Sequence, residues 1–175
     1  MNDFYPSRPD DALFLPLIGA LRDTLSAKKL LMATAESCTG GLMASLCTDM
    51  AGSSAWFAGG VVSYSNAMKE KVLGVPADIV REHGAVSEET VRHMARGALG
   101  VCGAGAAVAV SGVAGPDGGT EAKPVGTVWI AWALDVTATG TVRTEARRFL
   151  FPGNRSEVRL ATAAEGFKGL LQLLQ

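Results

Sequence analysis

The sequence predicts a three-layer α/β/α sandwich built on a mixed sheet of about five strands. Segments with apolar residues at helical spacing alternate with short apolar runs through most of the chain, which indicates strands joined by helices. The last two predicted strands follow each other directly, so at least one pair is expected to be antiparallel. The chain of 175 residues is expected to form a single domain over 1–175, with a loosely attached N-terminus over 1–10.

Two predicted strands and their flanking helices account for the first part of the chain. Apolar residues recur at helical spacing over 10–27, and the short apolar run over 30–35 predicts a buried strand. Thr39 is expected to cap the helix that follows this strand. A second strand is predicted over 59–65, and Asn66 is expected to cap the next helix.

The remaining elements are predicted from turn residues and apolar runs. A turn is expected between Pro76 and Gly84, and Ser87 is expected to cap a strong amphipathic helix. The small apolar run over 106–111 predicts a central strand. Strands are also predicted over 126–134 and, nearer an edge, over 141–151, and apolar spacing from residue 160 to 174 predicts a C-terminal helix.

Composition limits the classes of function. The net charge of −1 and the absence of a basic stretch argue against nucleic acid as a partner. No apolar run reaches the roughly 18 to 20 residues that span a membrane, and the first residues do not form a signal peptide. The chain has three cysteines, Cys38, Cys47 and Cys102, and no CxxC pair. This odd number argues against a disulfide framework and a zinc site, and it favours a cytoplasmic location.

Three polar loops follow predicted strands, over 36–41, 64–69 and 111–123. Ligands of open α/β sheets gather at the carboxyl ends of strands, so these loops are candidates for one site. In the first loop Ser37 is either a nucleophile or a helix cap. Glycines beside it allow close backbone approach to a substrate, and free amides at a helix start can hold an oxyanion or a phosphate.

A serine nucleophile needs a base, and the chain offers few. The two histidines, His83 and His93, follow no predicted strand, so a Ser-His-Asp triad is disfavoured. Lys69 lies near a predicted helix start, where the dipole and desolvation favour the neutral amine. It is either the base for Ser37 or a solvated helix residue, and Tyr64 is placed to hydrogen-bond either group.

Two further segments are candidates for anion binding. The glycine-rich loop over 112–124 is neither a Walker loop nor a dinucleotide fingerprint, but its amides can form an anion-binding nest, unless it is only a long connection. Arg155 and Arg159 begin the last predicted helix. They can grip a phosphate together, or they are exposed charges at a helix start.

Taken together, these segments resemble the CinA C-terminal domain family. The resemblance covers roughly residues 13 to 174. The motifs that carry it are Ala35-Glu36-Ser37-Cys38-Thr39-Gly40-Gly41, residues 52–57 (GSSAWF), Tyr64-Ser65-Asn66 with Lys69, Gly84-Ala85-Val86-Ser87, residues 111–119 (SGVAGPDGG) and residues 123–128 (KPVGTV).

The resemblance implies hydrolysis of nicotinamide mononucleotide to nicotinate mononucleotide and ammonia, in bacterial pyridine-nucleotide salvage. It implies a mixed-sheet α/β/α fold and a Ser/Lys mechanism, with Ser37 as nucleophile, Lys69 as base and Tyr64 assisting, and it requires no metal or cofactor. Larger relatives carry an extra N-terminal domain of molybdopterin-binding type, and the resemblance is to the stand-alone enzymes. The residues expected to bind substrate are Glu36, Thr39, Gly40, Gly41, Ser111, Gly112, Gly115, Asp117, Gly118, Arg155 and Arg159.

Three alternatives remain open at this point. The chain could be a non-catalytic module that binds a pyridine nucleotide or a phosphate. Cys38 could replace Ser37 as nucleophile, because a thiolate is intrinsically stronger. A competence-associated role in DNA uptake is the third, and the net charge argues against direct DNA binding. The chain is also a candidate for a homodimer or another homo-oligomer.

Overall fold

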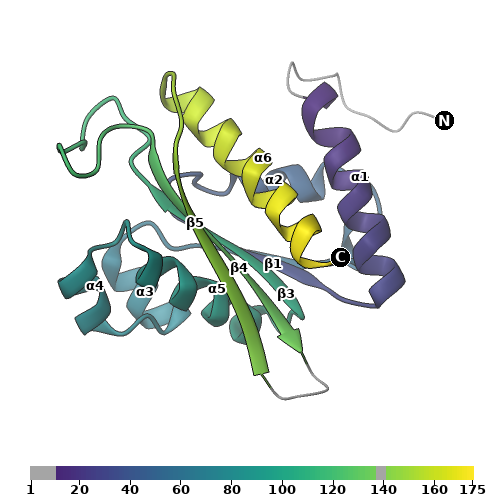
Figure 1. Cartoon of the computed structure of the whole chain (residues 1–175). Coiled ribbons are helices and arrows are strands. Elements are labelled where there is room, and N and C mark those ends of the chain that lie inside the picture. The colour runs from purple at the N-terminus through teal and green to yellow at the C-terminus, as the bar shows by residue number, and fades with distance from the viewer. Residues whose placement is uncertain (1–10, 137–140) are drawn as a thin grey trace.

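The computed structural model describes residues 11–136 and 141–175, and the expectation for residues 1–10 lies outside them. A five-stranded mixed sheet with the order β2-β1-β3-β4-β5 forms the centre (Figure 1). β1 pairs in parallel with β2 and β3, whereas β4 is antiparallel to both β3 and β5, as expected. The strands are β1 (Met32–Glu36), β2 (Phe57–Val62), β3 (Ala106–Gly112), β4 (Thr127–Val136) and β5 (Thr141–Leu150).

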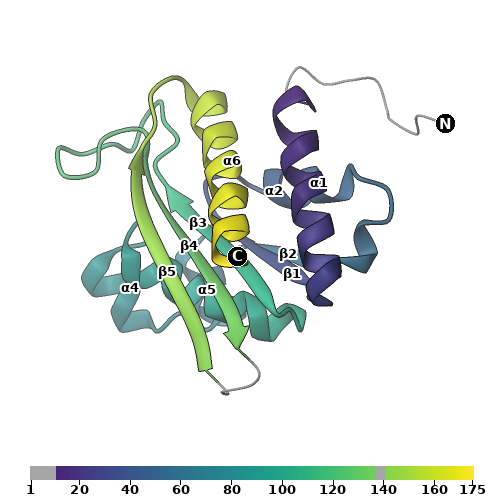
Figure 2. The ribbon, with the colours of Figure 1, turned by 45° about the vertical axis from the view of Figure 1, so that its right-hand side comes forward.

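Helices cover both faces of the sheet (Figures 1 and 2). On one face lie α1 (Asp11–Lys28), α2 (Leu42–Thr48) and α6 (Arg155–Leu173), whose apolar side chains pack on β3 and β4 in one core. On the other face α3 (Asn66–Leu73), α4 (Ala77–His83) and α5 (Glu88–Cys102) form a second core. A short 3-10 helix, η1 (Ser53–Ala55), precedes β2. The three-layer α/β/α prediction is confirmed.

The central strand β3 shows why this sheet is buried on both sides. Val108 and Val110 point into the core under α1, α2 and α6, whereas Ala107 and Ala109 point into the core under α5. All four are fully buried. Alternation is the ordinary consequence of strand geometry, and the alanines leave room for α5 to lie close to the sheet.

Three local predictions differ from the structure. Thr39 does not cap α2, because its N-cap position is occupied by Gly41, which has no side chain of its own to cap the helix. Ser65, not Asn66, caps α3, because its hydroxyl accepts a hydrogen bond from the Met68 amide. The predicted turn over 76–84 contains helix α4. The predicted cap Ser87 is confirmed by its bond from the Thr90 amide. In the described parts of the chain, no helix combines the length and apolarity needed to cross a membrane.

Candidate active site

The three polar loops meet at one edge of the sheet. The carboxyl ends of the parallel strands β1, β2 and β3 lie together there, so segments far apart in sequence become neighbours. A cavity of about 210 Å³ opens at this edge. Its lining includes Ser37, Tyr64, Lys69, Ser111, Gly112 and Arg155, so each of the three loops and the start of α6 contribute.

A buried serine–lysine pair occupies this cavity. Lys69 Nζ lies 3.1 Å from Ser37 Oγ, and the two side chains are only 1% and 8% exposed. Lys69 Nζ also donates to the backbone carbonyls of Ser63, at 2.7 Å, and of Tyr64, at 3.2 Å. Both carbonyls follow β2, and Lys69 is in the first turn of α3, so the turn between the two elements fixes the amine.

The surroundings of Lys69 favour its neutral form. Burial lowers the pKa of the Lys69 amine below its ordinary value of 10.5, and this desolvation outweighs the opposing effect of the nearby Cys38 thiol. In the described part of the chain, no carboxylate lies within ion-pairing distance of Nζ to restore the charge. A neutral amine next to a hydroxyl is the arrangement that lets a lysine act as a base.

Cys38 does not have the properties of a competing nucleophile. It lines the same cavity, but its side chain is only 5% exposed. Desolvation raises the pKa of the thiol to about 12, so the reactive thiolate is scarce at neutral pH. The lysine amine hydrogen-bonds Ser37 rather than Cys38. The geometry therefore favours the serine.

Glu36 holds the turn in place and does not reach the cavity. Its fully buried carboxylate accepts hydrogen bonds from the amides of Gly41, Met43 and Ala44 at 2.8–3.1 Å and from the Thr34 hydroxyl at 3.1 Å. A carboxylate at a helix start also interacts favourably with the helix dipole. Glu36, expected to bind substrate, therefore performs the capping of α2 that the sequence assigned to Thr39.

Replacing Glu36 by alanine is expected to lower the free energy of unfolding by about 3 kcal/mol or more, because it leaves three amides and a buried hydroxyl without their acceptor. Urea denaturation followed by circular dichroism measures this change. Glu70, on α3, provides a control: Glu70→Ala is expected to change stability by less than about 1 kcal/mol. Equal stability of Glu36→Ala and the unaltered protein would contradict the assignment.

Tyr64 contacts Lys69 through its backbone. Its side chain is 65% exposed, and the contact with Lys69 is made by its backbone carbonyl. Among the described residues, the phenol makes no hydrogen bond to Ser37 or Lys69. The contact with Lys69 in this structure is therefore a backbone contact, whereas Tyr64 also lines the cavity, and an assisting role for its hydroxyl stays a prediction.

The two arginines of α6 tie loops together. Arg155 donates to the Gly115 carbonyl at 2.8 Å, and Arg159 donates twice to the Thr39 carbonyl, at 2.7 and 3.2 Å. Arg155 lines the cavity, whereas Arg159 is not among its lining residues. In this structure Arg159 holds the backbone of the Ser37 loop, and the joint grip of the two arginines on a phosphate stays a prediction.

The expected backbone donors divide into two groups. The Gly40 amide donates to the Ser37 carbonyl and the Gly41 amide to Glu36, so neither is available to a substrate. In the glycine-rich loop Gly112 and Ala114 line the cavity. Within the described chain the Ala114 amide has no hydrogen-bond partner, which makes it a candidate oxyanion donor.

Other residues of this loop serve different purposes. The Ser111 hydroxyl donates to the Ala85 carbonyl at 2.7 Å and thereby joins the end of β3 to the segment before α5. Asp117 and Gly118 are exposed and do not line the cavity.

The sequence reasoning missed Ala85 and Val86 as cavity residues and Ser63 as a partner of Lys69. The Gly84-Ala85-Val86-Ser87 motif was a signal for the first two. Because Ser63 acts through its backbone, its side chain gave no indication. Within residues 11–136 and 141–175, no group of histidine, cysteine, aspartate and glutamate side chains could hold a metal ion.

An α/β sandwich with polar loops gathered at the ends of parallel strands defines a class of small-molecule-binding α/β proteins. Within that class, the CinA C-terminal domain matches residues 16–174, and the chain belongs to this family.

Relatives and solved structures agree with this assignment. The chain is 54% identical over 140 residues to nicotinamide-nucleotide amidohydrolase PncC of Pseudomonas putida, covering 80% of this chain and 84% of the relative. It is 48% identical over 162 residues to the protein of that name from Escherichia coli K12, covering 93% and 95%. The crystal structure of a competence/damage-inducible protein from Agrobacterium tumefaciens superimposes with a TM-score of 0.85 at 38% identity, over 100% of each chain.

Proposed function

We propose that the chain is a nicotinamide-nucleotide amidohydrolase that converts nicotinamide mononucleotide to nicotinate mononucleotide and ammonia, within pyridine-nucleotide salvage. The observation that carries the proposal is the contact of 3.1 Å between Lys69 Nζ and Ser37 Oγ in a buried cavity. The names of the two PncC relatives support the substrate. The whole chain, 1–175, acts as one catalytic domain in the cytoplasm.

The two carbonyls that hold Lys69 prepare it for proton transfer. A neutral amine has two N–H groups, and the carbonyls of Ser63 and Tyr64 accept both. The nitrogen lone pair is then left to accept from the Ser37 hydroxyl, whose oxygen lies 3.1 Å from Nζ. Lys69 takes the hydroxyl proton while Ser37 Oγ forms a bond to the carboxamide carbon.

The remaining steps return every group to its starting state. The Ala114 amide, in the turn that follows β3, stabilises the oxyanion of the tetrahedral intermediate. The C–N bond breaks, and protonated Lys69 gives its proton to the departing ammonia. Water then attacks the acyl group: its proton passes through Lys69 to Ser37, and its oxygen leaves in the product carboxylate. None of these steps uses a metal or a cofactor.

The rate is expected to rise with pH through the pKa of Lys69. Only the neutral amine accepts the Ser37 proton, so activity is lost as pH falls through that pKa, which burial places below 10.5. Measurement of kcat across about pH 5 to 10, with circular dichroism over the same range to establish that the protein stays folded, tests this. A flat profile would contradict a lysine base.

The main competing function is a module that binds the nucleotide without turnover. Incubation of the purified protein with nicotinamide mononucleotide distinguishes the two. The proposal predicts ammonia and nicotinate mononucleotide in equal amounts, whereas binding without either product would establish the module. Thermal stabilisation by the nucleotide reports binding in both cases.

A further inference from the structure

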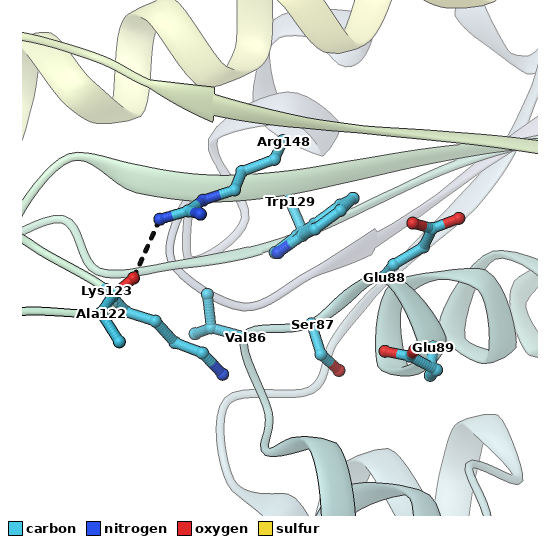
Figure 3. A pocket seen from close by; sticks show the side chains of 8 residues that line it. All are labelled: Val86, Ser87, Glu88, Glu89, Ala122, Lys123, Trp129 and Arg148. Atoms are coloured by element: carbon cyan, nitrogen blue, oxygen red, sulfur yellow. Dashed lines mark hydrogen bonds between the residues drawn. The ribbon is translucent and has the colours of Figure 1, made fainter.

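A second cavity, of about 270 Å³, lies at the start of α5, and Figure 3 shows the side chains that line it. Val86 lines this cavity and the Ser37 cavity, so the two are neighbours. Lys123, Trp129 and Arg148 surround the second space, from the glycine-rich loop, β4 and β5. Trp129 and Arg148 face each other across the β4–β5 pair, so the sheet register sets their positions.

Both cations of this cavity retain donors for a ligand. Arg148 donates one hydrogen bond to the Ala122 carbonyl at 2.9 Å, and Lys123 Nζ donates one to the His83 carbonyl at 3.1 Å. In the part of the chain that the structure describes, neither is paired with a carboxylate. The bonds to carbonyls orient the two side chains and leave their charges uncompensated.

Two acidic residues also line this cavity, and neither forms an ion pair with Lys123 or Arg148 in the described residues. Glu88 is paired with Arg92 at 2.7 Å, and Glu89 lies 3.5 Å from His83. The start of α5, which Ser87 caps, also lines the second cavity. The positive end of the helix dipole at a helix start favours anions. The chemistry of this cavity is therefore that of an anion site beside an aromatic ring.

The sizes of the cavities indicate how they are used. Each cavity is smaller than the roughly 300 Å³ at which ligand pockets commonly begin, and the two share Val86 in their linings. A mononucleotide has a reacting carboxamide at one end and a phosphate at the other, so we expect it to extend from one cavity to the other. Among the described residues that line the Ser37 cavity, Arg155 is the one arginine that could meet the phosphate, whereas the second cavity is lined by two cations, Lys123 and Arg148.

The geometry points to Lys123 and Arg148 as the residues that bind the phosphate of the nucleotide, with Trp129 beside the ribose and the carboxamide at Ser37. This inference rests on the proposed function and adds the basis of its substrate selectivity: the second cavity selects a phosphomonoester over the unphosphorylated nucleoside. Charge-assisted hydrogen bonds from two cations provide that selection.

The test compares nicotinamide mononucleotide with nicotinamide riboside, which lacks only the phosphate. Lys123→Ala and Arg148→Ala are each expected to raise KM for the nucleotide about tenfold or more, and to change KM for the riboside little. Inorganic phosphate is expected to inhibit the unaltered protein competitively and to lose potency in both variants. Arg147→Ala is the matched control, because Arg147 neighbours Arg148 but lies over the Trp132 ring, 5.6 Å from its centroid.

The outcomes separate this inference from the proposed function. Equal effects of the variants on both substrates would overturn it, as would loss of nucleotide preference in Arg155→Ala alone. If the unaltered protein released no ammonia from either compound, the proposed function would fail. Calorimetry would then test the phosphate site through binding alone. Lys123→Ala and Arg148→Ala are expected to weaken binding of the nucleotide and to change binding of the riboside little, and equal effects on both would overturn the inference.

Discussion

Replacing Ser37 by alanine is expected to lower ammonia release from nicotinamide mononucleotide by about 10⁴-fold or more, because no acyl bond can form. Ser37 is the group in contact with the Lys69 amine, and its hydroxyl is small enough for alanine to leave the packing intact. Nucleotide binding measured by calorimetry is expected to persist. Continuous detection of ammonia at saturating substrate measures the fall in kcat.

The control for this variant is the neighbouring thiol. Cys38→Ser changes one atom of a side chain that is 5% exposed and whose thiol has its pKa raised to about 12. Activity is expected to stay within an order of magnitude of the unaltered protein. The opposite pattern, with activity lost in Cys38→Ser and kept in Ser37→Ala, would make the cysteine the nucleophile.

Replacing Lys69 by methionine is expected to lower kcat by about 10²- to 10⁴-fold, the usual contribution of a positioned general base. Methionine retains most of the buried apolar volume and removes the amine. Lys69→Arg is not expected to restore activity, because a guanidinium stays protonated and cannot accept the Ser37 proton. Ammonia release by the folded variants, verified by circular dichroism, is the measurement.

Lys71 offers a matched control on the same helix, α3, where it is exposed. Lys71→Met removes the same charge from the surface, and its kcat is expected to match that of the unaltered protein. Similar losses in Lys69→Met and Lys71→Met would show that net charge, and not a buried base, controls the rate.

The sheet was predictable because its strands have simple patterns. The run of small apolar residues that became β3 fits only a strand covered on both faces, and it is the middle strand of the five. The antiparallel pairing of β4 and β5 followed from the lack of a helix between them. Helix starts were harder to predict, because Ser65 and Asn66 are both good caps and only the structure decides between them.

The roles of Ser37 and Lys69 could be predicted from the sequence, but the contacts that position the two side chains could not. The loop positions placed both residues at one edge of the sheet, and the lack of suitable histidines directed attention to the lysine. The carbonyl of Ser63 that fixes the amine could not be predicted, because it is a backbone group. Glu36 was expected in the substrate site because the sequence does not reveal the direction of its side chain. In the structure its carboxylate accepts hydrogen bonds from amides at the start of α2.

Contacts between distant segments were beyond sequence reasoning. Arg159 reaches the Thr39 carbonyl across 120 positions of the chain, and Arg92 reaches the Thr144 carbonyl across 52. Such bonds depend on how α5 and α6 pack on the sheet. The second cavity has the same origin, because the register of β4 and β5 brings Trp129 and Arg148 together.

The double variant Ser37→Ala/Lys69→Met tests most directly whether the two residues act as one catalytic unit. Groups that share one proton transfer lose their effect together, so removal of the second adds little once the first is gone. The kcat for ammonia release by the double variant is therefore predicted to match that of Ser37→Ala. A further fall by the full factor seen in Lys69→Met would show that the lysine acts independently of the serine and would contradict the proposed pair.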